Sequence, residues 1–165
     1  MFPQTDEISN IISDTVRVVF KRRLVDRVLR LWTEMAGDQR FPRHDQIEPS
    51  MLGVDWMNCL VVAVQSPVQL SYFVAVGENL SFRHSSDESL AGVLLSHLPK
   101  VLSGRRCLMI EGSTKLRDID ILYRSGLYPL SDDGIAIDHV LGAANYRPLR
   151  ENEDLGAALV RTKWL

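Results

Sequence analysis

The strongest constraint on the fold is a pair of alternating segments near the C-terminal end of the chain. In residues 117–130 and 134–146 apolar side chains recur at every second position. A period of two is typical of β-strands, because successive side chains of a strand point to opposite faces. The intervening residues 131–134, Ser-Asp-Asp-Gly, accept the backbone angles of a tight turn. The two segments therefore predict a long antiparallel hairpin.

Three further strands are expected before this hairpin. Residues 58–65 and 69–76 are short runs rich in valine and aromatic side chains, separated by Ser-Pro-Val, and a first hairpin is the simplest interpretation. Residues 106–111 are similarly apolar and predict one more strand. The sequence thus predicts five strands in all.

Two helical regions complete the predicted order. Apolar residues between positions 14 and 36 recur at steps of three or four, which predicts an amphipathic helix that ends at Gly37. Residues 87–103 predict a second helix, interrupted or kinked at Pro99, and residues 41–49 are an extended connector with two prolines. The predicted class is α+β, with helices between the second and third strands.

Charge is concentrated in the first helix. The chain has 165 residues and a net charge of −2, yet residues 15–30 hold six basic side chains against one acid. The segment therefore carries +5 and the rest of the chain −7. The basic residues form either a solvated helix face or a face that docks an acidic partner or a second subunit.

Composition excludes several classes of protein. The longest unbroken apolar runs are about five residues, so we expect neither a membrane span nor a signal peptide. A net negative charge argues against nucleic-acid binding by phosphate neutralisation. Two cysteines, Cys59 and Cys107, match neither a zinc site nor a disulfide framework, and we expect both to be buried in a cytoplasmic protein without a structural metal.

Residues near both ends of the central region resemble a known family. The stretches 31–49 and 127–147 are similar to the PAS-related domain that is widespread in alphaproteobacteria, formerly a family of unknown function. The positions that carry the resemblance are Trp32, Gly37, Pro42, Arg43, Ile47, Pro49, Pro129, Leu130, Ser131, Asp133, Gly134, Leu141 and Gly142.

The resemblance implies a PAS-like five-stranded antiparallel sheet with helices on one face. Residues 1–40 would be an N-terminal helical extension, 41–147 the PAS-like domain and 148–165 a C-terminal tail. It also implies a sensory or signalling module, not an enzyme, that binds a small ligand and acts through contact with a regulatory or signalling protein. The resemblance further implies a homodimer, and the sequence identifies no cofactor. No output domain is expected beside it.

His139 is the most prominent candidate for a ligand pocket. Alternation places it on one face with Ile135, Ile137 and Leu141, although such a histidine can equally be a structural side chain. The remaining pocket candidates are Ile137, His97, Tyr72, Phe73 and Tyr123, and for the three aromatic residues core packing is the alternative. His97 lies on the helical segment where haem-binding PAS domains can place their axial histidine. His44 and His84 receive no role, and Asp132 and Asp133 are interpreted as exposed turn residues.

The dimer-interface candidates lie on the apolar stripe of the first helix. They are Phe20, Leu24, Val28 and Leu31. The stripe is wide enough to pack against the helix's own sheet as well as a neighbour, and Trp32 is expected to anchor helix to sheet.

Two other functions remain open. One is a small isomerase-like enzyme that uses His139 with Asp118 or Asp120 as a base, and the other is a scaffold without a ligand. The tail, with Leu155, Leu159 and Trp164 on one side of a short predicted helix, would dock on the domain, bind a partner or fray.

Overall fold

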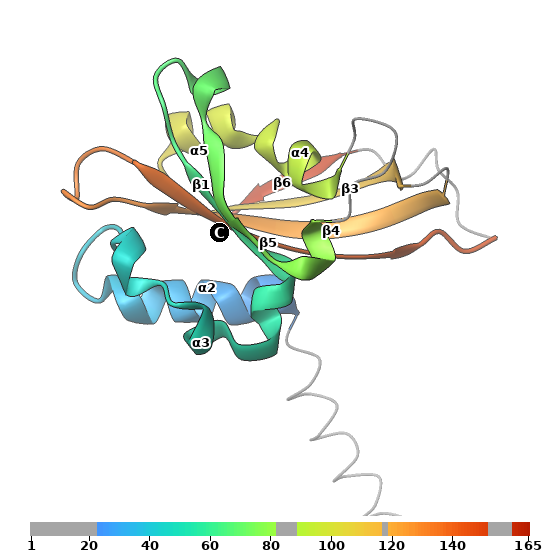
Figure 1. Ribbon diagram of the computed structural model, residues 1–165, viewed down its shortest axis with the longest axis horizontal. Coiled ribbons are helices and arrows are strands. Elements are labelled where there is room, and N and C mark those ends of the chain that lie inside the picture. The colour runs from blue at the N-terminus through green and yellow to red at the C-terminus, as the bar shows by residue number, and fades with distance from the viewer. Residues whose placement is uncertain (1–22, 82–88, 117–118, 152–159) are drawn as a thin grey trace, which may run out of the picture.

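A computed structural model describes residues 23–81, 89–116, 119–151 and 160–165 (Figure 1). The α-helices are α2 (Leu24–Ala36), α3 (Pro49–Leu52), α4 (Leu90–Leu95) and α5 (Leu98–Gly104), and short 3-10 helices cover His44–Gln46, Gly53–Asn58, Val68–Leu70 and Glu78–Leu80. The strands are β1 (Cys59–Ala63), β2 (Tyr72–Val76), β3 (Leu108–Leu116), β4 (Ile119–Leu130), β5 (His139–Pro148) and β6 (Arg161–Trp164).

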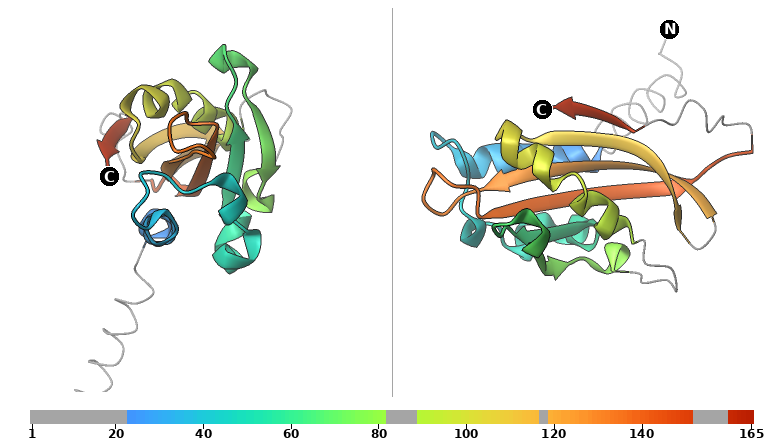
Figure 2. Two further views of the ribbon diagram at one scale, coloured as in Figure 1. Left: turned by 90° about the vertical axis from the view of Figure 1, so that its left-hand side faces the viewer. Right: turned by 90° about the horizontal axis from the view of Figure 1, so that it is seen from above.

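The strands form one antiparallel sheet in the order β2-β1-β5-β4-β3-β6. The predicted α+β class and both predicted hairpins, β1–β2 and β4–β5, are therefore confirmed. The expected number of strands was one too few, because the end of the chain adds β6 to the free edge of β3. Helices α4 and α5 carry the chain across one face of the sheet from β2 to β3 (Figure 2).

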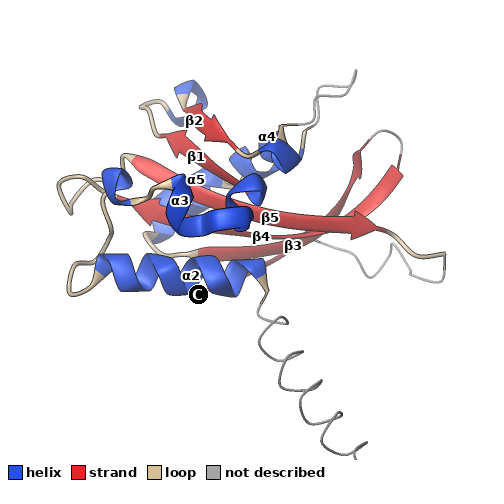
Figure 3. Ribbon diagram, turned by 60° about the horizontal axis from the view of Figure 1, so that its bottom comes forward, coloured by secondary structure: helices blue, strands red, loops and turns tan. Residues whose placement is uncertain are grey.

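Helix α2 packs along the opposite face of the sheet, with α3 beside it (Figure 3). Leu24, Val25 and Val28 are buried there in one cluster with β-strand residues. Two hydrogen bonds tie the helix to β4: Trp32 Nε1 donates to the carbonyl of Pro129 at 2.8 Å, and Tyr128 Oη donates to the carbonyl of Val25 at 2.7 Å. The predicted role of Trp32 as an anchor between helix and sheet is confirmed.

Two of the predicted dimer-interface residues on this helix prove to be core residues. Leu24 is 3% exposed and Val28 is fully buried, so both belong to the core beneath the protein's own sheet. Leu31 is half-buried and packs against the same cluster. Phe20 lies outside the described residues, as does the part of the predicted helix before residue 23. The part of the apolar stripe from Leu24 onward, which the structure describes, is thus used within the chain.

A second apolar core lies under α4 and α5. Leu94, Leu98 and Val101 of these helices are buried with Tyr123 and Leu127 of β4. The break between the two helices falls at residues 96–97, before the proline, and Pro99 occupies the first turn of α5, where its missing N–H removes no helical bond. The predicted interruption is therefore present as two separate helices.

The β4–β5 connection is longer than the predicted tight turn. Leu130 pairs with His139, which leaves residues 131–138 as a loop. Asp133 organises it, because its Oδ1 accepts hydrogen bonds from the backbone N–H groups of Ile135 and Ala136 at 2.8 and 2.9 Å. The expectation that Ile135 begins a strand is wrong, and its side chain is 74% exposed.

The C-terminal segment also differs from its prediction. Trp164, expected on a short helix, lies in β6 opposite Leu108 and packs against the α4–α5 core. Leu155 and Leu159 lie outside the described residues. Of the three alternatives for the tail, the structure shows docking on the sheet for residues 161–164.

Both cysteines are buried and free, as predicted. Burial raises the pKa of each thiol, Cys59 and Cys107, to about 12, so burial outweighs the neighbouring charge of Arg106 at Cys107. Neither is a reactive thiolate. Among the described helices none is long and apolar enough to cross a membrane.

Candidate functional site

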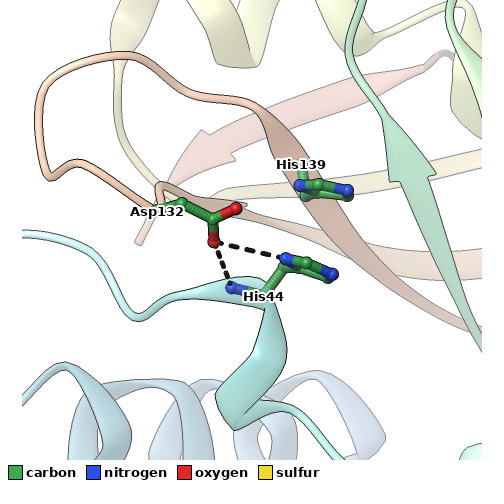
Figure 4. Close-up of side chains that lie close together, drawn as sticks. All are labelled: His44, Asp132 and His139. Carbon is green, nitrogen blue, oxygen red and sulfur yellow. Dashed lines mark hydrogen bonds and ion pairs between the residues drawn. The ribbon is translucent and has the colours of Figure 1, made fainter.

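Three polar side chains from distant parts of the sequence meet at one end of the sheet. His44 opens the 3-10 helix after α2, Asp132 lies in the β4–β5 loop, and His139 is the first residue of β5. One potential ligand atom from each lies within 4.8 Å of those of the other two (Figure 4). We refer to these three residues as the His-Asp-His cluster.

The two imidazole rings are stacked. The centroids of His44 and His139 are 3.9 Å apart and the ring planes differ by 11°. In Figure 4 the carboxylate of Asp132 lies beside the rings, at the ends that carry one nitrogen of each. Its Oδ1 is 3.2 Å from Nδ1 of His44 and accepts the backbone N–H of His44 at 3.3 Å.

A second carboxylate holds His139. Oδ1 of Asp138 is 2.7 Å from Nδ1 of His139, while Oδ2 of Asp138 accepts the backbone N–H of Asp132 at 2.7 Å. Asp138 therefore positions both the ring of His139 and the backbone of Asp132. Such carboxylate–histidine pairs fix the orientation and the tautomer of an imidazole.

The backbone around the cluster is held by the connector. The N–H of Ser131 donates to the carbonyl of Pro42 at 3.0 Å, and Asp138 is joined to the strands through its own N–H, which donates to the carbonyl of Leu130 at 3.1 Å. The connector after α2 and the β4–β5 loop therefore lie side by side. This contact is the reason that residues 88 positions apart, His44 and Asp132, can meet.

The side chains of the cluster differ in exposure. The side chain of His139 is 16% exposed, that of His44 39% and that of Asp132 49%. Slight burial opposes ionisation of Asp132, but hydrogen bonds from the side chain and backbone of His44 and the charges of both histidines outweigh it, so the pKa of Asp132 is lowered. The cluster is thus open to solvent on one side and holds a carboxylate in its ionised form.

The cluster combines two imidazoles with the carboxylate of Asp132, and a second carboxylate, that of Asp138, contacts the ring of His139. Imidazole nitrogen and carboxylate oxygen are the ligands that zinc and similar first-row dications take in proteins. His44, Asp132 and His139 are therefore the described residues that could hold such an ion.

The cluster lies on the α2 face of the sheet. His139 pairs with Leu130 and Ala63, and Ala63 pairs in turn with Tyr72. Directly paired residues share a face, so His139, Ala63 and Tyr72 form a row across the sheet. Tyr72 at the end of that row is 56% exposed.

The predicted pocket residues consequently divide between the two faces. Tyr123 is buried in the α4–α5 core, and Phe73 and Ile137 pack against that core. His139 and Tyr72 lie on the other face, so the expectation that His139 shares a face with Ile137 is corrected. The alternation used to place His139 began at Ile135, which is in the loop and has no strand register.

His97 is the remaining pocket candidate and is separate from the cluster. It is the residue before α5, and partial burial, aided by the charge of Lys100, lowers its pKa. It is therefore held mainly as neutral imidazole at neutral pH.

The structure does not support the catalytic pair considered from the sequence. His139 is paired with Leu130 at one end of β4, whereas Asp120 lies ten residues away near the other end. At about 3.3 Å per residue the two are about 33 Å apart. Asp118 lies outside the described residues.

The basic face of α2 is partly neutralised within the protein. Arg27 makes two hydrogen bonds of 2.8 Å to the carboxylate of Asp55, and Arg30 is 3.1 Å from Glu34. The hydrogen bonds that Arg27 donates to Asp55 raise the pKa of Arg27 against an opposing effect of burial. Arg17, Lys21 and Arg22 lie outside the described residues.

Sequence reasoning missed His44 and the ligand potential of Asp132. The dipeptide His44-Asp45 stands between prolines in the connector, where nothing in a local pattern points to a partner. The one available signal was that both His44 and His139 stand beside an aspartate. Comparison with known proteins adds nothing to the geometry, because no family model, no curated protein and no solved structure matches the chain.

Proposed function

We propose that this protein is a non-enzymatic sensory or signalling module of the PAS type that acts through contact with another protein. The observation that carries the proposal is the sheet order β2-β1-β5-β4-β3, with α4 and α5 as the crossover between β2 and β3. This agrees with the order of strands and helices that the family resemblance implies. The fold, and not a catalytic site, supports this function.

The proposed ligand lies between the sheet and the crossover helices. Phe73, Tyr123 and Ile137 come from β2, β4 and the β4–β5 loop and converge on the core that contains Leu94 and Leu98. The apolar and aromatic side chains of this core would suit a small, flat, mostly apolar molecule. A ligand there would act by shifting α4 and α5 and so changing the surface offered to a partner.

The proposal includes a cytoplasmic homodimer. Because Leu24 and Val28 are core residues, the contact between two copies would use other side chains of the N-terminal region or of the sheet edges.

Native mass spectrometry of the protein purified from its own cells tests the ligand. We expect a mass above that of the chain, which returns to the chain mass on denaturation. Ile137→Ala should reduce the retained ligand, whereas Ile135→Ala, in the same loop but exposed, should not.

Cross-linking of the tagged full-length protein in those cells tests the partner. We expect one regulatory protein to be enriched over an untagged control, and its yield to change with Ile137→Ala. A protein that carries no ligand and enriches no partner would end the proposal.

A further inference from the structure

We propose that the His-Asp-His cluster is a binding site for a late first-row divalent metal ion of the zinc type, with His44, Asp132 and His139 each supplying one ligand atom. The site is distinct from the proposed site of the small ligand, because the cluster lies on the α2 face and the core proposed for the ligand lies on the α4–α5 face. The proposal also does not depend on the PAS assignment.

The first argument is the number and type of converging groups. Two imidazoles and one carboxylate is a ligand set that zinc uses in proteins when water fills the remaining position. The three ligand atoms already lie within 4.8 Å of one another, and His44 Nδ1 is 3.2 Å from Asp132 Oδ1. Ligand atoms at about 2.1 Å from a tetrahedral zinc are about 3.4 Å apart. To bind an ion, the ligand atoms have to approach by about an ångström, and the two stacked rings have to turn out of their parallel arrangement so that both nitrogen lone pairs point at the ion.

The second argument is the support behind the ligands. Asp138 holds Nδ1 of His139 at 2.7 Å and the backbone of Asp132 at 2.7 Å, so one side chain positions two of the three ligands. Because Asp138 holds Nδ1 of His139, the ion would bind Nε2 of that ring. A carboxylate on the other nitrogen of a ligating histidine is the usual outer partner in metal sites, where it fixes the ring and increases its basicity. Asp138 is thus a positioning residue of the proposed site.

The third argument is local charge. The carboxylates of Asp132 and Asp138 lie beside the two imidazoles, which are stacked at 3.9 Å, at a partly exposed position. A dication placed among the four groups would balance the charge of the two carboxylates. Magnesium and calcium prefer sites made of oxygen ligands, so the two imidazoles select against them.

A bound ion would link two separate segments of the chain. His44 belongs to the connector after α2, while Asp132 and His139 belong to the β4–β5 hairpin. A metal bound to all three would fasten the connector to the hairpin and stabilise the folded state, because the unfolded chain does not hold the ligands together.

The test uses the purified full-length protein, freed of metal with a chelator and titrated with Zn²⁺ by calorimetry and with Co²⁺ by visible absorption. We expect one ion per chain, a Co²⁺ spectrum of a low-coordinate nitrogen and oxygen site, and no competition from Mg²⁺. With Zn²⁺ at about a hundredfold excess over its Kd, the midpoint of thermal unfolding should rise by about 5–10 °C.

Variants assign the ion to the cluster. His44→Gln, at a half-buried position, and Asp132→Asn, at an exposed one, should remain folded by circular dichroism and weaken Zn²⁺ binding at least about tenfold. His139→Gln should do the same. His97→Gln removes a half-buried histidine outside the cluster and should leave the affinity unchanged.

Three results would overturn the proposal. They are the absence of stoichiometric Zn²⁺ binding by the wild-type protein, binding that survives both His44→Gln and Asp132→Asn, and binding that His97→Gln reduces as much as His44→Gln does. Asp138→Asn refines the assignment, because a positioning residue should change the Co²⁺ spectrum and weaken binding less than loss of a ligand.

Discussion

The two faces of the sheet are held to their helices in different ways. On the α2 face, buried and half-buried hydrogen bonds run from side chains to backbone carbonyls: Tyr128 to Val25, and Trp32 to Pro129. On the α4–α5 face the core contacts are apolar. The described polar links of α5 and its cap to other elements, Lys100 to Thr162 and Arg105 to the carbonyl of Ile135, are exposed.

This difference separates a fixed face from an adaptable one. A buried hydrogen bond is directional, and leaving one partner unpaired is costly, so the α2 face specifies a single arrangement. Apolar contacts have no preferred direction and tolerate small shifts of α4 and α5. The adaptable face is the one to which we assign the small ligand, and the fixed face carries the His-Asp-His cluster.

The largest expected loss of stability comes from placing a charge on the buried face of α2, which tests whether the helix is part of the core. Val28→Asp would bury a carboxylate with no partner and should cost more than about 3–5 kcal/mol, enough to unfold the chain. Urea unfolding followed by circular dichroism measures this. The exposed Arg30→Ala should change stability by less than about 0.5 kcal/mol. A folded, soluble Val28→Asp protein would show that α2 detaches from the sheet.

The next effect compares one tyrosine from each face. Tyr128→Phe removes the fully buried hydrogen bond from Oη to the carbonyl of Val25, which keeps its partner within the helix, and should destabilise the protein by about 1–1.5 kcal/mol. Tyr123→Phe removes the hydroxyl that lies against Gly112 on the other face and should change stability by less than about 0.5 kcal/mol. Equal losses in chemical unfolding would contradict the contrast between the two faces.

Trp32→Phe should have a smaller effect than Tyr128→Phe. It keeps an aromatic ring against β4 but loses the hydrogen bond to Pro129 at a half-buried position, which should cost about 0.5–1.5 kcal/mol. A shift in the denaturant midpoint with an unchanged slope would support this. No change at all would mean that water replaces the indole N–H.

The smallest expected effect is a pH dependence from the α4–α5 face. Burial lowers the pKa of His97 in the folded state, so the unfolded chain binds more protons at this position. Its contribution to stability is complete above the unfolded pKa, about 6.5, and is lost as the pH falls from there toward the folded pKa. The difference in stability between the wild type and His97→Gln should therefore shift against the wild type between about pH 7.5 and about pH 5. A pH-independent difference would show that His97 is fully solvated.

Local patterns predicted the elements with a local signature. The alternation before residue 130 and the valine-rich runs around Cys59 and Phe73 correspond to strands, and the helical period after Leu24 corresponds to α2. The burial of both cysteines and the anchoring role of Trp32 were predicted in the same way, because the spacing of apolar residues indicates which face of a helix or strand is buried.

Register and distant partners were not predictable in this way. A period of two counts positions but does not say where pairing resumes after a loop, so the hairpin was expected to continue at Gly134, whereas pairing begins again at His139. That error grouped His139 with Ile135 and Ile137, which lie in the loop, whereas within β5 His139 does share a face with Leu141, as the alternation predicted. The end of the chain became β6 because the free edge of β3 offers backbone partners that a short helix cannot use.

By itself the sequence determined an α+β protein with two hairpins, a buried pair of cysteines and an amphipathic N-terminal helix. Only the tertiary structure decided that the apolar stripe of α2 packs against the protein's own sheet, and that His44 stacks on His139 beside Asp132. Hydrophobic periodicity is a property of neighbours along the chain. The meeting of His44 with Asp132, 88 residues apart, depends instead on how the connector folds back on the β4–β5 loop, and no local pattern encodes that contact.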